Sequence, residues 1–247
     1  MIEKTIAVVS DIHGNSWALQ AVLDDLKKRN VDVIFNLGDS LYGPLDPAGT
    51  FQLLRKQDPV SISGNEDRLI VEYVDSRTKS PTMEYVLSEL GVEAFQWLRS
   101  LPQTRIVDDF FLCHGTPEKD DAYLIEKITP RGVELRNTRD LLREICNIKQ
   151  AVICCGHSHM KNLIEPCPKK YIVNPGSVGL PAYEDYLPYL HVMESSNPNA
   201  SYCIVKKEND RYRIEHILVS YDWEAAADCA ANNRREDWSK WLRTGKA

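Results

Sequence analysis

The first two-thirds of the chain alternates short apolar runs with longer stretches whose apolar residues recur at helical spacing. The runs are rich in β-branched and aromatic residues and lie at 5–10, 31–37, 59–63, 110–113 and 151–155. Between the first two runs, residues 15–30 carry apolar side chains every three or four positions and end in three basic residues. This alternation predicts an α/β fold that contains a β-α-β unit.

The rest of the chain follows other patterns. Residues 66–101 are predicted to be helical, with Ser80 and Pro81 as a helix start and Gly91 as a break, and we expect them to form a helical insertion or cap. Shorter alternating runs favour an antiparallel second sheet and lie at 171–174, 189–194, 201–208 and 212–220. Two C-terminal helices are expected within 222–247. Because no repeat or linker interrupts residues 1–247, we predict a single domain.

The last predicted helix, residues 235–243, places Trp238, Trp241 and Leu242 on one face, with basic residues nearby. Such a face can lie on a membrane surface or pack against the protein itself. A short amphipathic helix usually packs, so we expect docking onto the body or onto a second subunit.

Composition narrows the classes of function. Of 247 residues, 43% are hydrophobic and 27% are charged, as in soluble globular proteins. The chain has no apolar stretch long enough to span a membrane and no basic segment before its first apolar run, so we expect a cytoplasmic protein without a membrane partner. A net charge of −6 argues against bulk nucleic-acid binding but not against a small phosphate ester. The oligomeric state stays open.

Side chains that can bind metals follow all five apolar runs. They are Asp11 and His13, Asp39, Asn65, His114, and His157 with His159. In extended backbone, residues two positions apart project to the same side, so each closely spaced pair is expected to reach one point. The carboxyl ends of strands in an open α/β sheet meet at one crevice. Seven ligands are too many for one tetrahedral ion and enough for two ions, with Asp39 as the natural bridge.

Each of these signals is weak alone, because a single histidine at a strand end is usually structural. A metal site is favoured because a side chain that can bind a metal follows each of the five apolar runs. His191 and His216 lack such neighbours and are interpreted as structural. A structural zinc site built from Cys113, Cys154, Cys155 and His157 is disfavoured, because adjacent cysteines on a strand point to opposite faces.

The motifs "SDIHGN", "LGDSLYGPLDP", "SGNED", "CHGTP" and "CGHSH", in this order, resemble the calcineurin-like metallophosphoesterase family, and the later "VNPGSVGLP" resembles its compact phosphodiesterase-like branch. The resemblance implies a two-sheet β-sandwich flanked by helices, a four-layer α/β/β/α fold. It implies that Asp11, His13 and His159 hold one divalent ion. A second ion would be held by Asn65, His114 and His157, with Asp39 bridging the two. Manganese, iron, zinc or nickel suits such ligands, with manganese favoured.

The family resemblance implies a metal-dependent phosphoesterase that hydrolyses phosphodiester or phosphomonoester bonds with a metal-bridging hydroxide. Asn65 would contact both metal and phosphate. Many members have a histidine where this chain has Glu66, which we interpret as a general acid, as an outer metal contact or as a helix start. Asn15 and Asn174 lie in turns expected near the site, either as substrate contacts or as capping residues.

Two alternative functions stay open. Dinucleoside polyphosphate hydrolases and protein phosphatases of the larger family have an arginine near positions 41–43, and this chain has none there. A non-catalytic protein-binding scaffold would usually have lost metal ligands, whereas all seven are present here.

Overall fold

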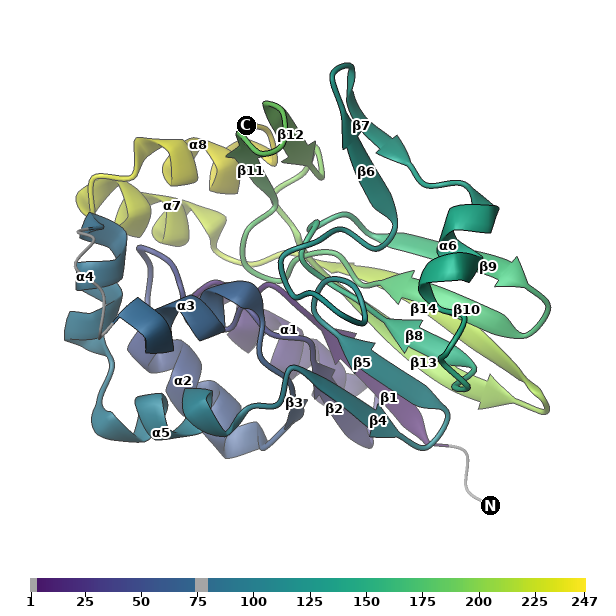
Figure 1. Ribbon diagram of the computed structural model, residues 1–247. Helices are drawn as coiled ribbons and strands as arrows, with labels where there is room; N and C mark the ends of the chain where they lie inside the picture. Colours follow the sequence, from purple (N-terminus) through teal and green to yellow (C-terminus); the bar gives the residue numbers. More distant parts are fainter. Residues whose placement is uncertain (1–3, 74–79) are drawn as a thin grey trace.

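The computed structural model describes residues 4–73 and 80–247, which form two five-stranded sheets stacked face to face (Figure 1). The first sheet has the order β14-β13-β1-β2-β3, with β1 (Thr5–Val9), β2 (Val33–Asn36), β3 (Val60–Ser61), β13 (Ala200–Glu208) and β14 (Arg211–Val219). The second has the order β4-β5-β8-β10-β9, with β4 (Thr104–Val107), β5 (Phe110–Cys113), β8 (Val152–Cys154), β9 (Asn162–Cys167) and β10 (Lys170–Asn174). Two hairpins stand apart, β6 (Glu126–Thr129) with β7 (Gly132–Leu135) and β11 (Ala182–Asp185) with β12 (His191–Glu194).

Each sheet contains three adjacent parallel strands. β1, β2 and β3 are parallel, as are β5, β8 and β10, while β13, β14, β4 and β9 run antiparallel to their neighbours. The expectation of a separate antiparallel second sheet after His159 was wrong. β13 and β14 extend the first sheet, and β10 joins β8 in the second. Alternating apolar and polar residues predict which face of a strand is buried, but they do not predict which strand lies beside it.

Helices cover the outer faces of both sheets. α1 (Ser16–Lys28), α2 (Pro47–Gln57), α3 (Asn65–Tyr73), α4 (Pro81–Glu89) and α5 (Val92–Ser100) lie over the first sheet, and α6 (Thr138–Glu144) over the second (Figure 1). Along β1, Val8 faces the core between the sheets, while Ala7 and Val9 face the helices. This alternation has the period of an extended strand. The four-layer α/β/β/α fold is therefore confirmed.

The range 66–101, where the sequence predicts helix, contains α4, α5 and all of α3 except its first residue, Asn65. Residues 74–79 of that range lie outside the described residues. Ile70, Val86 and Leu98 are buried in the same core as Val22 of α1. The helices therefore share the main core of the first sheet, and their designation as an insertion stays a prediction.

The two C-terminal helices are α7 (Trp223–Asn232) and α8 (Glu236–Thr244), and they pack together at one end of the molecule (Figure 1). Asp222 caps α7 by accepting a hydrogen bond from the backbone N–H of Ala225. Trp238 and Leu242 of α8 are buried in a core that α7 shares. The apolar face of α8 thus docks onto the body. Among the described residues, no helix combines the length and apolar content needed to cross a membrane.

The cysteines are distributed over separate cores. Cys154 lies between the sheets, whereas Cys113 and Cys155 lie on the outer face of the second sheet. The zinc site considered from these cysteines is therefore absent from the described residues, because its members face opposite sides of the second sheet.

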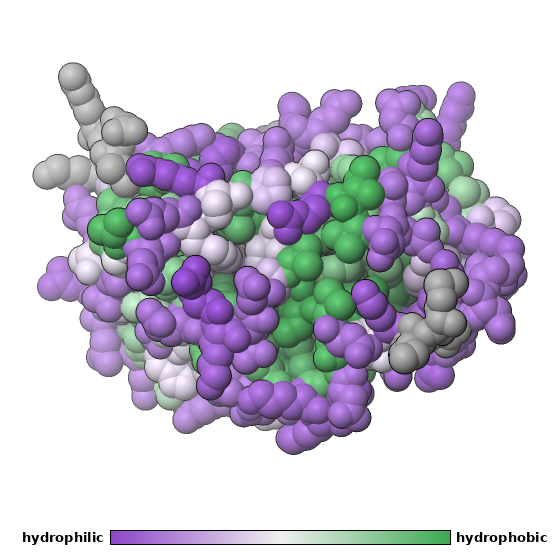
Figure 2. Space-filling view, turned by 90° about the horizontal axis from the view of Figure 1, so that it is seen from below, coloured by the Kyte–Doolittle hydropathy of each residue, from purple (hydrophilic) through white to green (hydrophobic). Residues whose placement is uncertain are grey.

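Figure 2 views the molecule from below, at the end away from α8 and β11, and shows a band of hydrophobic surface between hydrophilic areas.

Candidate metal centre

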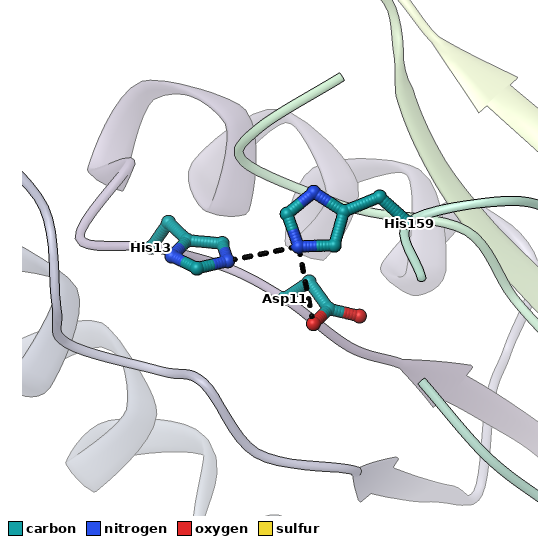
Figure 3. Close-up of side chains that lie close together, drawn as sticks. All are labelled: Asp11, His13 and His159. Carbon is teal, nitrogen blue, oxygen red and sulfur yellow. Dashed lines mark hydrogen bonds and ion pairs between the residues drawn. The ribbon is translucent and has the colours of Figure 1, made fainter. Parts of the chain in front are cut away.

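Asp11, His13 and His159 converge on one point (Figure 3). The Nε2 atoms of His13 and His159 are 3.1 Å apart, and Nε2 of His159 is 3.4 Å from Oδ1 of Asp11. Asp11 and His13 follow β1, whereas His159 follows β8 of the other sheet. All three residues are buried, with at most 5% of their surface exposed. Three potential ligands from two sheets therefore share one small volume.

Asp39, His114 and His157 form a second group of the same kind. Nε2 of His114 is 3.1 Å from Oδ2 of Asp39. The groups are neighbours, because the same Nε2 atom lies 3.8 Å from Oδ1 of Asp11 in the first group. The five strands that supply these six residues and Asn65 are divided between the two sheets. The site therefore lies where strand ends of both sheets meet.

The backbone of the site is not extended. Asp11, His13, Asp39, His157 and His159 all have positive φ angles, between 51° and 66°. This left-handed region costs a non-glycine residue about 1 kcal/mol or more. The expectation that extended pairs reach one point was therefore wrong in its geometry. His157 and His159 belong to different groups, although Asp11 and His13 do share one.

Hydrogen bonds between loops hold this strained backbone. The N–H groups of Asp11 and His13 donate to the carbonyl oxygens of Gly38 and Asp39, at 3.0 and 2.9 Å. On the other side, Ser177 Oγ donates to the carbonyl oxygen of Asp11 at 2.7 Å. The loops after β1 and β2 and the segment around Ser177 thus fix one another. The protein itself positions the side chains.

Three of the four histidines are also oriented through their rings. Nδ1 of His13, His114 and His159 contacts the backbone carbonyl oxygens of Tyr42, Leu37 and Leu180, at 3.2, 2.8 and 2.7 Å. An N–H donated to each carbonyl leaves Nε2 directed into the site, which is the usual arrangement of metal-binding imidazoles. His157 differs, because its ring stacks on Tyr123 with centroids 4.8 Å apart.

Electrostatics favour cation binding. Burial and the neighbouring His159 lower the pKa of His13 to about 4, and burial and His114 lower the pKa of His157 to about 4, so both imidazoles are neutral near pH 7. Burial alone would lower the pKa of His114, but the nearby Asp39 raises it to about 10. Burial alone would raise the pKa of Asp39, yet the pairing with His114 holds it well below its ordinary value. A metal ion bound by His114 would displace that proton.

The buried oxygen atoms that make no hydrogen bond within the described part of the chain include two from the metal-binding side chains, Oδ2 of Asp11 and Oδ1 of Asn65. Leaving such atoms unpaired costs free energy, which a bound cation would recover. The seven side chains supply nitrogen and oxygen donors without a thiolate. The residues therefore fit a site for divalent metal ions.

The sequence model of the calcineurin-like phosphoesterase superfamily domain matches residues 5–210, which is most of the chain. The chain belongs to the calcineurin-like phosphoesterase superfamily. The family resemblance is thus confirmed, and the chain is in general terms a phosphoesterase hydrolase of a family that uses divalent metals.

The chain is also similar to one protein in sequence and to solved structures in fold. The uncharacterized protein MJ0912 of Methanocaldococcus jannaschii is 28% identical over 257 residues, covering 96% of each chain. The metallophosphoesterase from Sphaerobacter thermophilus has the same fold, with a TM-score of 0.75 at 23% identity, covering 98% of this chain and 99% of that one. A candidate diadenosine tetraphosphatase aligns over 89% of this chain and 95% of its own, with a TM-score of 0.54 at 17% identity.

In this phosphoesterase, Asn65, Glu66 and Asp67 begin α3 beside the two groups. The backbone N–H of Glu66 donates to Oδ1 of Asp39 at 2.8 Å, and its carboxylate lies 3.7 Å from Nδ1 of His13. Burial, Asp39 and Asp67 raise the pKa of Glu66 well above its ordinary value. Glu66 is therefore a helix-start residue whose side chain also lines the cavity, and its roles as a general acid or an outer metal contact stay predictions.

Asp67 was not identified from the sequence. It is buried, and it accepts hydrogen bonds from the N–H groups of Ser40 and Gly64 at 2.9 and 3.2 Å. It thus joins the loops that carry Asp39 and Asn65. The acidic run after Gly64 was the available signal, but it also fits a helix first turn.

Asn15 and Asn174 do not line the cavity. Asn15 is the N-cap of α1, and its amide group donates to the Gly179 carbonyl and the Tyr221 hydroxyl. Asn174 donates to the carbonyl of Gly156, beside His157. Both side chains are buried and bonded within the protein. The structure thus shows capping and loop-holding contacts for both residues, and their assignment as substrate contacts stays a prediction.

The metal-binding groups open into a cavity of about 320 Å³. This volume lies within the range of small-molecule sites. Beyond the metal-binding side chains, its walls include Tyr42, Tyr183, Glu184, Asp185, Arg235, Trp238 and Trp241. The last three come from α8 and the residue preceding it, and no pattern in the sequence placed them at the site.

Proposed function

We propose that this chain hydrolyses phosphodiester or phosphomonoester bonds at a centre of two divalent ions, with manganese favoured. Asp11, His13 and His159 would hold one ion, and Asn65, His114 and His157 the other, with Asp39 bridging. The observation that supports this proposal is the adjacency of two three-residue groups at the floor of one cavity. Two such ions, when bound, would supply a hydroxide nucleophile and neutralise phosphoryl oxygens.

The side chains then have separate tasks. Three of the four imidazoles are held by backbone carbonyls, so the geometry of the centre is largely set by folding. Asn65 lines the cavity at the first turn of α3, where its amide can reach both a metal ion and a phosphoryl oxygen. Glu66 is the neighbouring carboxyl that faces the substrate, and we assign it to the leaving oxygen because of this position.

A direct test compares Asp39→Asn with Asp109→Asn. Asp109 lies in the β4–β5 turn region, where it bonds Lys207 and Tyr212 away from the centre. We expect purified wild type and the Asp109 variant to bind close to two manganese ions and to hydrolyse bis(4-nitrophenyl) phosphate only when manganese is present. The Asp39 variant should lose both properties. Wild-type protein that binds no divalent metal would refute the proposal.

A scaffold function predicts a different outcome of the same test. The protein would then bind metal without hydrolysing activated mono- or diesters.

Glu66→Gln tests the assignment of Glu66 to the leaving oxygen. If its turnover and pH-rate profile matched wild type for substrates with poor leaving groups, Glu66 would have no role in leaving-group protonation.

A further inference from the structure

Part of the cavity wall comes from α8 and the residue before it, which follow the residues that the family model matches. The matched family region ends at residue 210, whereas Arg235, Trp238 and Trp241 line the cavity from the last helix of the chain. In Figure 1, α8 lies at the end of the molecule beside the β11–β12 hairpin. Part of the cavity wall therefore comes from residues far along the chain from the metal-binding side chains.

Two tryptophan rings that pack against each other form the aromatic part of this wall. Trp238 is 3% exposed, and its ring meets the ring of His13 edge-on with centroids 5.7 Å apart. The Arg235 guanidinium lies 5.3 Å from the centre of the Trp238 ring and donates to Asp237 and Thr82. Trp241 stands beside Trp238, with centroids 6.4 Å apart, and is only partly buried. A planar ligand would find a rigid aromatic surface next to the first metal-binding group.

The charges around this wall limit what can bind. Glu184 and Asp185 line the cavity from β11. The one cation among the residues named above as lining the cavity, Arg235, is already paired with Asp237. Carboxylates at the rim repel further negative charge. A ring without a second phosphate fits this surface better than a polyphosphate chain does.

We propose that α8 forms a substrate subsite for an uncharged aromatic ring, so that the preferred substrate is a phosphoester with one phosphate and a planar substituent. This inference rests on the proposed phosphoesterase function. The phosphate would lie at the metal-binding groups and the ring against Trp241. A cavity of about 320 Å³ has room for both.

Binding of two non-hydrolysable phosphonates tests the subsite without measuring turnover. Phenylphosphonate and methylphosphonate differ only in the ring, and their affinities for the manganese-loaded enzyme can be measured by titration calorimetry. We expect phenylphosphonate to bind about tenfold more tightly, as stacking on an indole allows. Trp241→Leu should abolish most of this ratio and leave methylphosphonate binding unchanged, whereas Trp241→Phe should retain much of it.

Trp223→Leu is the matched control, because Trp223 lies on α7 and packs against Tyr221 rather than lining the cavity. Its ratio should equal that of wild type. Equal affinities of the two ligands for wild type, or a ratio unchanged in Trp241→Leu, would overturn the subsite while leaving the proposed hydrolysis intact. If methylphosphonate failed to bind in a manganese-dependent way, both proposals would fail.

Discussion

Glu126 makes the stability of the fold depend on pH in a direction opposite to most carboxylates. It begins β6, is 4% exposed and accepts a hydrogen bond from Asn162 at 2.9 Å. Burial outweighs that bond and raises its pKa from 4.5 to about 7. As pH rises from 4.5 to 7, the unfolded chain releases this proton while the folded chain retains it. The contribution of Glu126 to stability is therefore fully present below pH 4.5 and is lost as the pH rises from 4.5 to about 7.

The size of the effect follows from the pKa difference. Each pKa unit is worth about 1.4 kcal/mol, so the penalty above pH 7 is about 3 kcal/mol, and about 2 kcal/mol of it develops between about pH 5.5 and about pH 8.5. Glu126→Gln keeps an acceptor for Asn162 and removes the charge. Relative to wild type, its free energy of unfolding in urea should therefore increase by about 2 kcal/mol over this interval.

Glu118→Gln is the control for this measurement, because Glu118 is exposed. Its unfolding free energy should follow wild type at every pH. Titration of the metal-binding groups contributes equally to all three proteins and cancels in the differences. If the Glu126 variant and wild type kept a constant difference from about pH 5.5 to about pH 8.5, the carboxyl would not be buried as described and the reasoning would be refuted.

Three further changes test how the site is held. A Cβ on Gly64 would lie 2.1 Å from Oδ1 of Asp39, so Gly64→Ala should weaken manganese binding about tenfold in calorimetry. Gly91→Ala is the control, because a Cβ there meets nothing within 4 Å, and it should bind manganese like wild type. Equal affinities of the two variants would contradict the close approach at Gly64. Tyr123→Leu removes the ring that stacks on His157 and should weaken one of two manganese sites about tenfold. Tyr123→Phe keeps the ring and should bind manganese like wild type. An unchanged affinity of the Leu variant would show that the ring does not position His157. Asn15→Ala removes the α1 cap and should lower the free energy of unfolding in urea by about 2 kcal/mol, without changing the affinity for methylphosphonate. Weaker methylphosphonate binding at unchanged stability would instead identify Asn15 as a substrate contact.

The strand ends were predictable because their signal is local. Asp11, Asp39 and His114 each follow a run of apolar residues, and a parallel strand must deliver its next residues to one edge of its sheet. The backbone at those ends was not predictable in the same way. Its left-handed conformation is enforced by bonds from loops far away in sequence, such as that from Ser177 to Asp11.

Other elements show where local patterns fail. The start of α2 carries a clear signal, Asp46 as N-cap followed by Pro47, yet the short apolar content of that segment did not suggest a helix. β13 is buried along most of its length, and nothing in its sequence states that it pairs with β1 rather than with β10. Trp238 and Trp241 have the spacing of any docked helix. Their place at the cavity depends on how α8 packs, which is a property of the whole fold.

The division of ligands between two sheets has a consequence for biosynthesis. Neither group is complete until the chain has been extended to His157 or His159, and the first sheet acquires β13 only some forty residues later. A nascent chain holding Asp11, His13 and Asp39 would present scattered donors on unpaired strands. If the centre binds ions as proposed, their capture would therefore come late in maturation, after strand ends of both sheets have met.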